Sequence, residues 1–229
     1  MSLARARVLP LALGSIAIAV LIALGIWQVE RRAWKLALIA QVEHRLAAAP
    51  IAAPGPVAWR TIGKDDAYTR VVAIGRYRAD ADTYTQAATD YGPGYWVMTP
   101  LDTGGWTLLV NRGFVPTAER GRHPAPAGQQ HVTGLLRVTE PKGGFLRSND
   151  SAADRWYSRD VAAIAARQGL RRTAPYFVDA DAQGSGWPRG GLTVVSFPNN
   201  HLVYALTWFG LAALVAFLLA RTLRDDDAG

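Results

Sequence analysis

The sequence contains no cysteine. This absence excludes disulfide bonds, thiolate metal sites and a cysteine nucleophile, but it leaves the cellular compartment undecided. The 229 residues include 25 Lys and Arg against 18 Asp and Glu, and the net charge of +7 is spread along the chain. Because there is no dense block of basic residues, the sequence gives no footprint for nucleic-acid binding.

Recognisable catalytic motifs are also absent. The sequence has no H-E-x-x-H, no G-x-S-x-G, no phosphate-binding P-loop and no G-x-G-x-x-G after a predicted strand. Gly184-Ser185-Gly186 is not a nucleophile elbow, because its spacing is wrong and no predicted strand leads into it. A triad assembled from distant Ser, His and Asp residues stays open, although no pattern indicates one. We therefore expect a protein that is not an enzyme.

Two long apolar runs, residues 8–29 and 202–220, contain no charged residue. Each is close to the ~20 residues that a helix needs to cross a ~30 Å hydrocarbon layer. We predict transmembrane helices over residues 8–29 and 201–220. A cleaved secretory signal is the alternative for the first run, but the run is longer than a typical signal core and no clear small-x-small cleavage site follows.

Two crossings would place both chain ends on one side of the membrane and the central domain, residues 30–200, on the other. The arginines of the short tails, residues 1–7 and 221–229, favour cytoplasmic ends under the positive-inside rule. Arg31, Arg32 and Lys35 flank the opposite side, but long segments are translocated largely regardless of their charge. We therefore expect the central domain to lie outside the cytoplasm.

The first helix is expected to continue beyond the membrane over residues 30–49. Trp34, Leu38, Val42 and Leu46 recur every four residues, which is typical of an amphipathic helix, and a proline follows at position 50. The proline-rich residues 50–58 are predicted to form a linker.

From residue 68 onward, short segments of β type alternate with Gly, Pro, Asp and Asn. The candidate strands are residues 69–77, 82–86, 95–99, 106–115, 130–138, 176–179 and 192–197. Residues 160–168 are predicted to form a helix that Gly169 terminates. These patterns indicate a membrane protein of the α+β class. A two-helix transmembrane hairpin would carry a mostly antiparallel β domain with one or two helices.

The ends of the two apolar runs that face the central domain carry polar and aromatic residues. His201, Tyr204 and Trp208 share one stripe of the second helix with Ala205, and Trp27, Arg31 and Lys35 share one stripe of the first. Because the central domain joins these ends, both must lie at the same face of the bilayer. A flat apolar molecule with acidic groups, such as haem, would find aromatic rings, cations and an imidazole ligand there.

A simpler interpretation of these residues is membrane anchoring. Trp and Tyr are common at membrane interfaces, and Arg and Lys side chains can hold lipid headgroups. His201 would then only fill the first turn of a helix capped by Asn199 or Asn200. On the residues alone this interpretation is the simpler one, because interfacial polar residues cost little to keep.

Three motifs occur in order along the chain. Residues 25–31 read G-I-W-Q-V-E-R, residues 110–116 read V-N-R-G-F-V-P, and residues 200–209 read N-H-L-V-Y-A-L-T-W-F. With them the chain resembles, over nearly its whole length, the surfeit locus family of cytochrome c oxidase assembly proteins. The main departure is Phe114, where that family commonly has tryptophan. Without the resemblance, Asn111, Arg112 and Gly113 would be interpreted as a strand end or β-bulge.

The resemblance implies a non-enzymatic factor of the bacterial inner membrane with a periplasmic central domain. Such a factor would bind haem a transiently and assist its insertion into subunit I of a haem-copper oxidase. Subunit I, membrane lipid and, as a further candidate, haem a synthase would be its partners. A structural membrane chaperone of the oxidase subunit that does not itself bind haem is the alternative.

The same resemblance implies a role for each site residue. His201 would be the axial ligand of the iron, with haem a between the two helices. The aromatic side chains would pack on the porphyrin, and the basic ones would lie near the propionates. Asn111, Arg112 and Gly113 would either contact a partner or stabilise the domain. The predicted haem site comprises Trp27, Gln28, Arg31, Lys35, His201, Tyr204 and Trp208.

Overall fold

The computed structural model describes residues 3–144, 147–193 and 198–227. The chain divides into two compact units. A helical unit comprises residues 1–41 and 196–229, and a β unit comprises residues 42–195.

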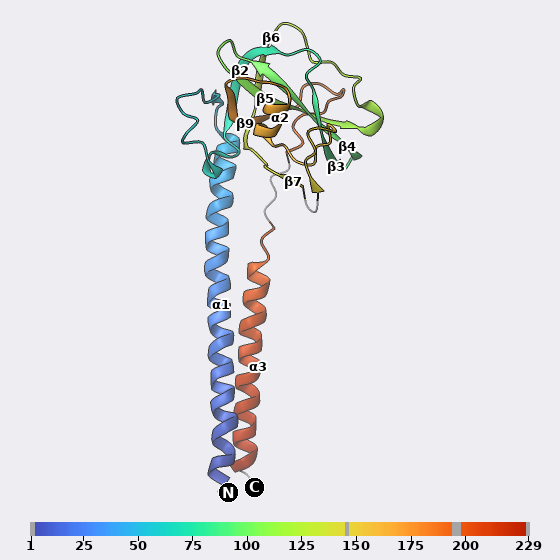
Figure 1. The fold of residues 1–229 in the computed structure, drawn as a ribbon. Helices are drawn as coiled ribbons and strands as arrows, with labels where there is room; N and C mark the ends of the chain where they lie inside the picture. The colour runs from blue at the N-terminus through green and yellow to red at the C-terminus, as the bar shows by residue number, and fades with distance from the viewer. Residues whose placement is uncertain (1–2, 145–146, 194–197, 228–229) are drawn as a thin grey trace. The chain divides into compact units, whose positions relative to one another are not determined.

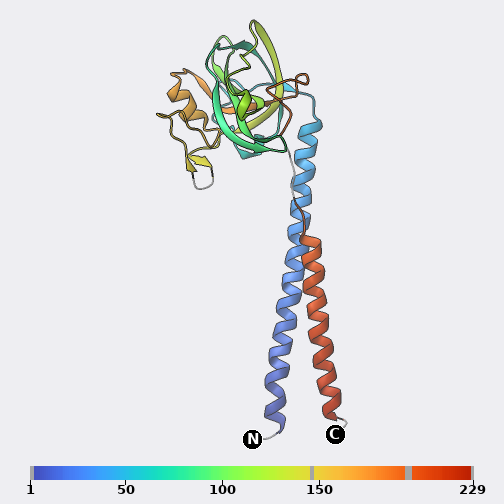
Figure 2. The same ribbon diagram turned by 90° about the vertical axis from the view of Figure 1, so that its right-hand side faces the viewer.

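The helical unit is a hairpin of two long helices. The helix α1 spans Leu3–Ala47, with its last residues in the β unit, and α3 spans His201–Asp227. The two helices run side by side in opposite directions, so the start of α1 and the end of α3 lie at the same end of the hairpin (Figures 1 and 2). Both are long and apolar enough to cross a membrane. The chain is therefore a membrane protein, as its apolar runs predict.

The hairpin packs along a seam whose positions alternate in steps of three and four residues. On α3 between residues 201 and 220, the seam positions are buried or half-buried and every other residue is exposed. A 3.5-residue repeat is the spacing of helices that pack as a left-handed coiled coil. The seam of α1 comprises Leu11, Gly14, Ile18, Leu21, Gly25 and Gln28, and that of α3 comprises His201, Ala205, Trp208, Ala212, Val215 and Leu219.

Small residues let the two helices approach closely. A Cβ atom built on Gly25 would lie 2.5 Å from Cε1 of Phe209, and one on Gly14 would lie 3.0 Å from Cδ2 of Leu219. On α3, Ala205 and Ala212 are 2% and 5% exposed. Small side chains at such positions are typical of helix pairs in membranes, where close van der Waals packing drives association.

The β unit is built around a strongly curved sheet with the strand order β1-β2-β6-β9-β5-β4-β3 (Figure 2). An additional pairing of β2 with β4 joins the two halves, so that β2, β6, β9, β5 and β4 form a closed ring. Most neighbours are antiparallel, while β1–β2 and β5–β9 are parallel. The strands are β1 Ile51–Ala52, β2 Arg70–Tyr77, β3 Thr83–Thr89, β4 Gly92–Asp102, β5 Thr107–Pro116, β6 Gln129–Val138 and β9 Thr173–Ala180.

Short elements complete this unit. A small two-stranded sheet pairs β7 (Gly143–Gly144) with β8 (Arg147–Ser148). The helix α2 spans Val161–Arg167, and two 3-10 turns span Lys64–Asp66 and Thr117–Glu119. Asp160 caps α2 by accepting a 3.1 Å hydrogen bond from the backbone of Ala163, which confirms the predicted helix start.

Six of the predicted strands are confirmed within a few residues, and the expected α+β membrane protein is confirmed as a class. The seventh predicted strand, residues 192–197, falls mostly outside the described residues, and residues 192–193 form no strand. The prediction that residues 50–58 form only a linker is wrong. Ile51 and Ala52 pair with β2, and the backbone oxygen of Pro54 accepts hydrogen bonds from Trp59 and Tyr176.

Two hydrophobic cores lie on opposite faces of the curved sheet. Alternation along β9 sends Tyr176 and Val178 into one core and Phe177 into the other. The first core fills the ring, and it includes Val71, Leu101, Leu108, Val132 and Leu136. The second packs against α2, and it includes Met98, Leu109, Trp156, Val161 and Ile164.

The closure of the ring depends on Gly75 in β2. A Cβ atom there would lie 2.4 Å from the backbone oxygen of Asp102 and 2.9 Å from Cγ of Leu101. We expect Gly75→Ala to lower the free energy of unfolding of the β unit by about 1–3 kcal/mol, because the crowded strand crossing must open.

Denaturant unfolding of the full chain in detergent, followed by tryptophan fluorescence, measures this change. Gly63→Ala is the matched control, because a Cβ atom added at Gly63 would have no neighbour within 4 Å. Equal stability of the two variants would contradict the role given to Gly75.

Candidate functional site

The hydrogen bond between His201 and Gln28 joins the two helices of the hairpin. Nδ1 of His201, the first residue of α3, lies 2.7 Å from Oε1 of Gln28. Both residues occupy seam positions, and Gln28 is 9% exposed. An unpaired polar group among apolar helices is costly, so each side chain satisfies the other.

The remaining predicted site residues divide between the seam and the outer surface of the hairpin. Trp208 is half-buried at a seam position, and Lys35 is half-buried on α1 about two turns beyond Gln28. Trp27 and Tyr204 are 52% and 53% exposed, and they lie off the seam. The structure therefore brings Gln28 and His201 into contact, while it leaves two of the three predicted aromatic rings on the outside of the hairpin.

Arg31 makes a contact that the sequence interpretation missed. Its guanidinium carbon lies 4.0 Å from the centroid of the Trp34 ring, a cation–π geometry. The three-residue spacing on one helix was the available signal. Phe209 was also missed as the ring that packs over Gly25, because a glycine does not reveal which partner approaches it.

The second predicted set, Asn111 to Gly113, lies within β5 and begins with a buried amide. Nδ2 of Asn111 donates to Oδ1 of Asp179 at 2.7 Å, and Oδ1 of Asn111 accepts from the backbone of Gly113 at 3.1 Å. Asp179, 5% exposed, also accepts from Arg137 at 2.7 Å, from Arg159 at 3.1 Å and from the hydroxyl of Thr193 at 2.8 Å. Asn111 therefore orients the carboxylate at the centre of this network.

The network balances two cations against two anions. Glu140 accepts from Nη2 and Nε of Arg159 at 2.5 Å and 3.0 Å, and it lies 3.6 Å from Arg137. Burial works to lower the pKa of the Arg159 guanidinium, but the charges of Asp179 and Glu140 outweigh it and the pKa is raised. Arg159 therefore stays protonated, and the ion pair of Arg137 with Asp179 joins β6 to β9.

Arg112 joins several segments of the β unit through hydrogen bonds. Its side chain is 8% exposed, and it donates to Asp82 at 3.1 Å and to the hydroxyl of Thr99 at 2.9 Å. It also reaches the backbone oxygens of His123 and Pro124, at 2.7 Å and 3.1 Å. This geometry favours the stabilising role over partner contact, because the guanidinium is already engaged within the domain.

Tyr77 lies beside this buried ion pair. Burial raises its pKa to about 12, with the charge of Asp82 acting in the same direction and that of Arg112 opposing it. The phenol is therefore neutral throughout the physiological range, and it acts here as a packing group rather than as an acid or base.

Gly113 lies in a β-bulge within β5, so of the two alternatives, a strand end or a bulge, the bulge is confirmed. Met98 pairs with Asn111 and Trp96 with Phe114, so that two residues of β5 oppose Val97 alone. Gly113 has a φ of +132°, and a Cβ atom there would lie 2.1 Å from the carbonyl carbon of Arg189. This close approach allows Phe114 and Arg189 to exchange two backbone hydrogen bonds of 2.9 Å. The bulge thus holds the segment that follows β9.

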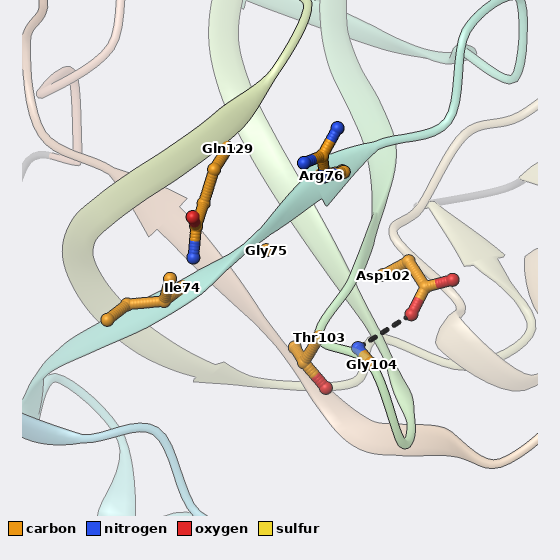
Figure 3. A pocket seen from close by; sticks show the side chains of 7 residues that line it. All are labelled: Ile74, Gly75, Arg76, Asp102, Thr103, Gly104 and Gln129. Atoms are coloured by element: carbon orange, nitrogen blue, oxygen red, sulfur yellow. Dashed lines mark hydrogen bonds between the residues drawn. The ribbon is translucent and has the colours of Figure 1, made fainter.

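A surface cavity of about 500 Å³ at the crossing of β2 and β4 is not a convincing binding site. Figure 3 shows that the side chains of Ile74, Arg76 and Asp102 diverge rather than converge on one point. Asp102 is occupied by a 2.8 Å hydrogen bond from the backbone of Gly104. Across the described ranges, no group of three or more His, Asp or Glu residues is placed to hold a metal ion.

The fold and these contacts define a class: a membrane protein with a helical hairpin and a curved β-sheet domain. The sequence profile of the SURF1 family matches residues 15–213. Surfeit locus protein 1 of Rattus norvegicus is 35% identical over 222 residues, which cover 86% of this chain and 70% of the relative. That of Homo sapiens is 34% identical over 223 residues, with coverages of 85% and 71%. A SURF1-like protein of Drosophila melanogaster is 32% identical over 226 residues, with coverages of 87% and 73%.

The chain therefore belongs to the SURF1 family, and the resemblance drawn from its three motifs is confirmed. This is a family of cytochrome c oxidase assembly factors.

The Asp179 network predicts that Asn111 is a stability residue. Asn111→Ala leaves the Asp179 carboxylate with one partner fewer and the backbone of Gly113 without its acceptor. We expect the free energy of unfolding of the β unit to fall by about 1–3 kcal/mol, which is the penalty for unsatisfied buried polar groups. Denaturant unfolding of the full chain measures it.

Gln129→Ala, which truncates an exposed amide of the same sheet, serves as the control. A loss no larger than that of Gln129→Ala would show that the network does not depend on Asn111.

Proposed function

We propose that this protein is an assembly factor for a haem-copper oxidase, and that it binds haem a on its helical hairpin and assists insertion of the haem into subunit I. The observation that supports this most is the histidine at the start of α3. One of its ring nitrogens is held by Gln28 at 2.7 Å, and the other is left to ligate iron. Membership of a family of oxidase assembly factors supplies the target.

The residues present fit haem a as a cargo. An imidazole is a common axial ligand of haem iron, and aromatic side chains pack on porphyrins. Trp27 and Tyr204 offer aromatic surface that is half exposed. Arg31 and Lys35 supply cations that can pair with the propionates. Haem a supplies redox chemistry once it is in the oxidase, whereas this chain only holds and releases it.

The packing of the hairpin bears on where such a cargo would lie. The Gly25–Phe209 contact and the burial of Ala205 fill the seam next to His201. A flat ligand would therefore lie against an outer face of the hairpin rather than between its helices. An outer position also suits transfer, because the ligand can leave sideways without separating the helices.

The proposed setting is the bacterial inner membrane, with both chain ends in the cytoplasm and the β unit in the periplasm. The arginines in both tails support this orientation, because the positive-inside rule counts Lys and Arg rather than net charge. The β unit would then contact subunit I, with haem a synthase as a further partner and membrane lipid around the hairpin. The role is one of binding and delivery, without turnover of a substrate.

A second candidate is a structural chaperone of the oxidase subunit that does not bind haem. The same hydrogen bond favours it, because a buried Gln–His pair can serve solely to fix the register of two membrane helices. Haem content separates the two functions.

We expect protein purified from cells that make haem a to carry the pigment, and His201→Ala to lose it, because the variant lacks the axial ligand. The visible spectrum and extracted haem per protein measure this. His44→Ala, which removes an exposed histidine of α1, should keep the wild-type spectrum. A folded His201→Ala protein with unchanged haem would exclude this histidine as ligand, and wild-type protein free of haem would favour the structural chaperone.

A further inference from the structure

We infer that Gln28 is a positioning residue for His201, and that it fixes Nε2 as the ring nitrogen that faces the iron. This inference rests on the proposed function, because it concerns how the hairpin presents its ligand. It adds a specific role for a residue of α1 that does not touch the iron itself.

The contact determines where the proton of the imidazole lies. A neutral imidazole carries one N–H and one lone pair, and an amide oxygen can only accept a hydrogen bond. The 2.7 Å contact between Nδ1 and Oε1 of Gln28 therefore places the proton on Nδ1. The lone pair is then on Nε2, which is the form that a metal requires.

The surroundings of Gln28 make this orientation persistent. The glutamine is 9% exposed on the seam, so little water competes for its oxygen. Gly25, one turn earlier, packs under the ring of Phe209 and sets the spacing of the helices at this level. The amide is thus held opposite the imidazole by backbone packing as well as by its own hydrogen bond.

An amide is also a moderate choice of acceptor. A carboxylate on Nδ1–H would draw the proton strongly and make the imidazole a more basic ligand, as in the carboxylate–histidine pairs of resident metal sites. A neutral amide orients the ring with a smaller increase in basicity. An imidazole that binds iron less tightly suits a protein that must transfer its haem to another protein.

A purely structural role for Gln28 would fix helix register and nothing else. Removal of the side chain would then reduce stability without changing the chemistry of the ring. A positioning role predicts two further changes, one in the tautomer of His201 and one in the reduction potential of the bound haem. These two readouts distinguish the roles.

The first experiment uses the full chain without haem, in lipid nanodiscs at mildly alkaline pH, with histidine labelled by ¹⁵N. Nuclear magnetic resonance should show His201 protonated at Nδ1 in the wild type, with the signal assigned by its loss in His201→Ala. Gln28→Leu should shift the ring toward a mixture of tautomers. Gln41→Leu, which removes an exposed glutamine of the same helix, should leave the signal unchanged.

The second experiment uses the haem-loaded full chain. We expect Gln28→Leu to weaken haem a binding about 10–100-fold, as losses of a partner behind a metal ligand typically do. Gln28→Glu keeps an acceptor, so it should retain the haem and lower its reduction potential. It also keeps the inference testable if the leucine variant does not fold.

The outcomes separate the inference from the proposed function. If the wild type holds haem a and His201→Ala loses it, but the Gln28 variants change neither tautomer nor potential, the inference is overturned and the proposed function stands. If the wild type holds no haem a, the proposed function fails and the inference fails with it. A changed tautomer together with a lowered potential in Gln28→Glu supports both.

Discussion

The hydrogen bond between Gln28 and His201 is the contact on which the arrangement of the hairpin depends. Within apolar helices, a polar side chain without a partner is costly, so the two residues constrain the register of α1 against α3. The glycine at position 25 then meets the ring of Phe209, and the small residues of α3 fall on the seam. The hydrogen bond therefore acts on both helix register and imidazole orientation, while the Gly25–Phe209 contact sets the spacing of the helices. His201 thus contacts the other helix of the hairpin, whatever further role it has.

The β unit has its own polar centre in Asp179. Four side chains converge on that carboxylate, from β5, β6 and the segments next to α2 and after β9. The motif at residues 110–116 in β5 contacts this centre. Asn111 orients the carboxylate of Asp179, and Gly113 allows the backbone of Arg189 to approach. Asn111 and Arg112, for which partner binding was one interpretation, thus make their contacts within the β unit.

Sequence patterns predicted what depends on local periodicity. The apolar runs indicated the hairpin, Asp160 and Gly169 bounded α2, and the glycine in Asn111-Arg112-Gly113 indicated a strand end or a bulge. Contacts between distant residues could not be predicted in this way. The pairing of Asn111 with Asp179, 68 positions away, and the closure of β2 on β4 depend on strand order, which alternating residues do not specify. Residues 50–58 were predicted to be a linker because the segment is rich in proline, but Ile51 and Ala52 within it pair with β2.

In the candidate site, too, the sequence could not show which residues of the two helices contact each other. His201, Tyr204, Ala205 and Trp208 all fit one helical stripe, and the sequence did not show which of them face α1. Only the 3.5-residue repeat that includes Ala205 and Ala212 separates the seam from the exposed Tyr204. Gln28 was named as a site residue without a partner, since a contact between helices cannot be read from either helix alone.

The central claim is that an imidazole nitrogen of His201 ligates the iron of haem a on this hairpin. Electron paramagnetic resonance of the oxidised, haem-loaded protein with ¹⁵N-labelled histidine tests it most directly through hyperfine coupling. The account predicts a coupling from one histidine nitrogen that persists in His44→Ala. Haem bound in full amount without any histidine coupling would contradict it.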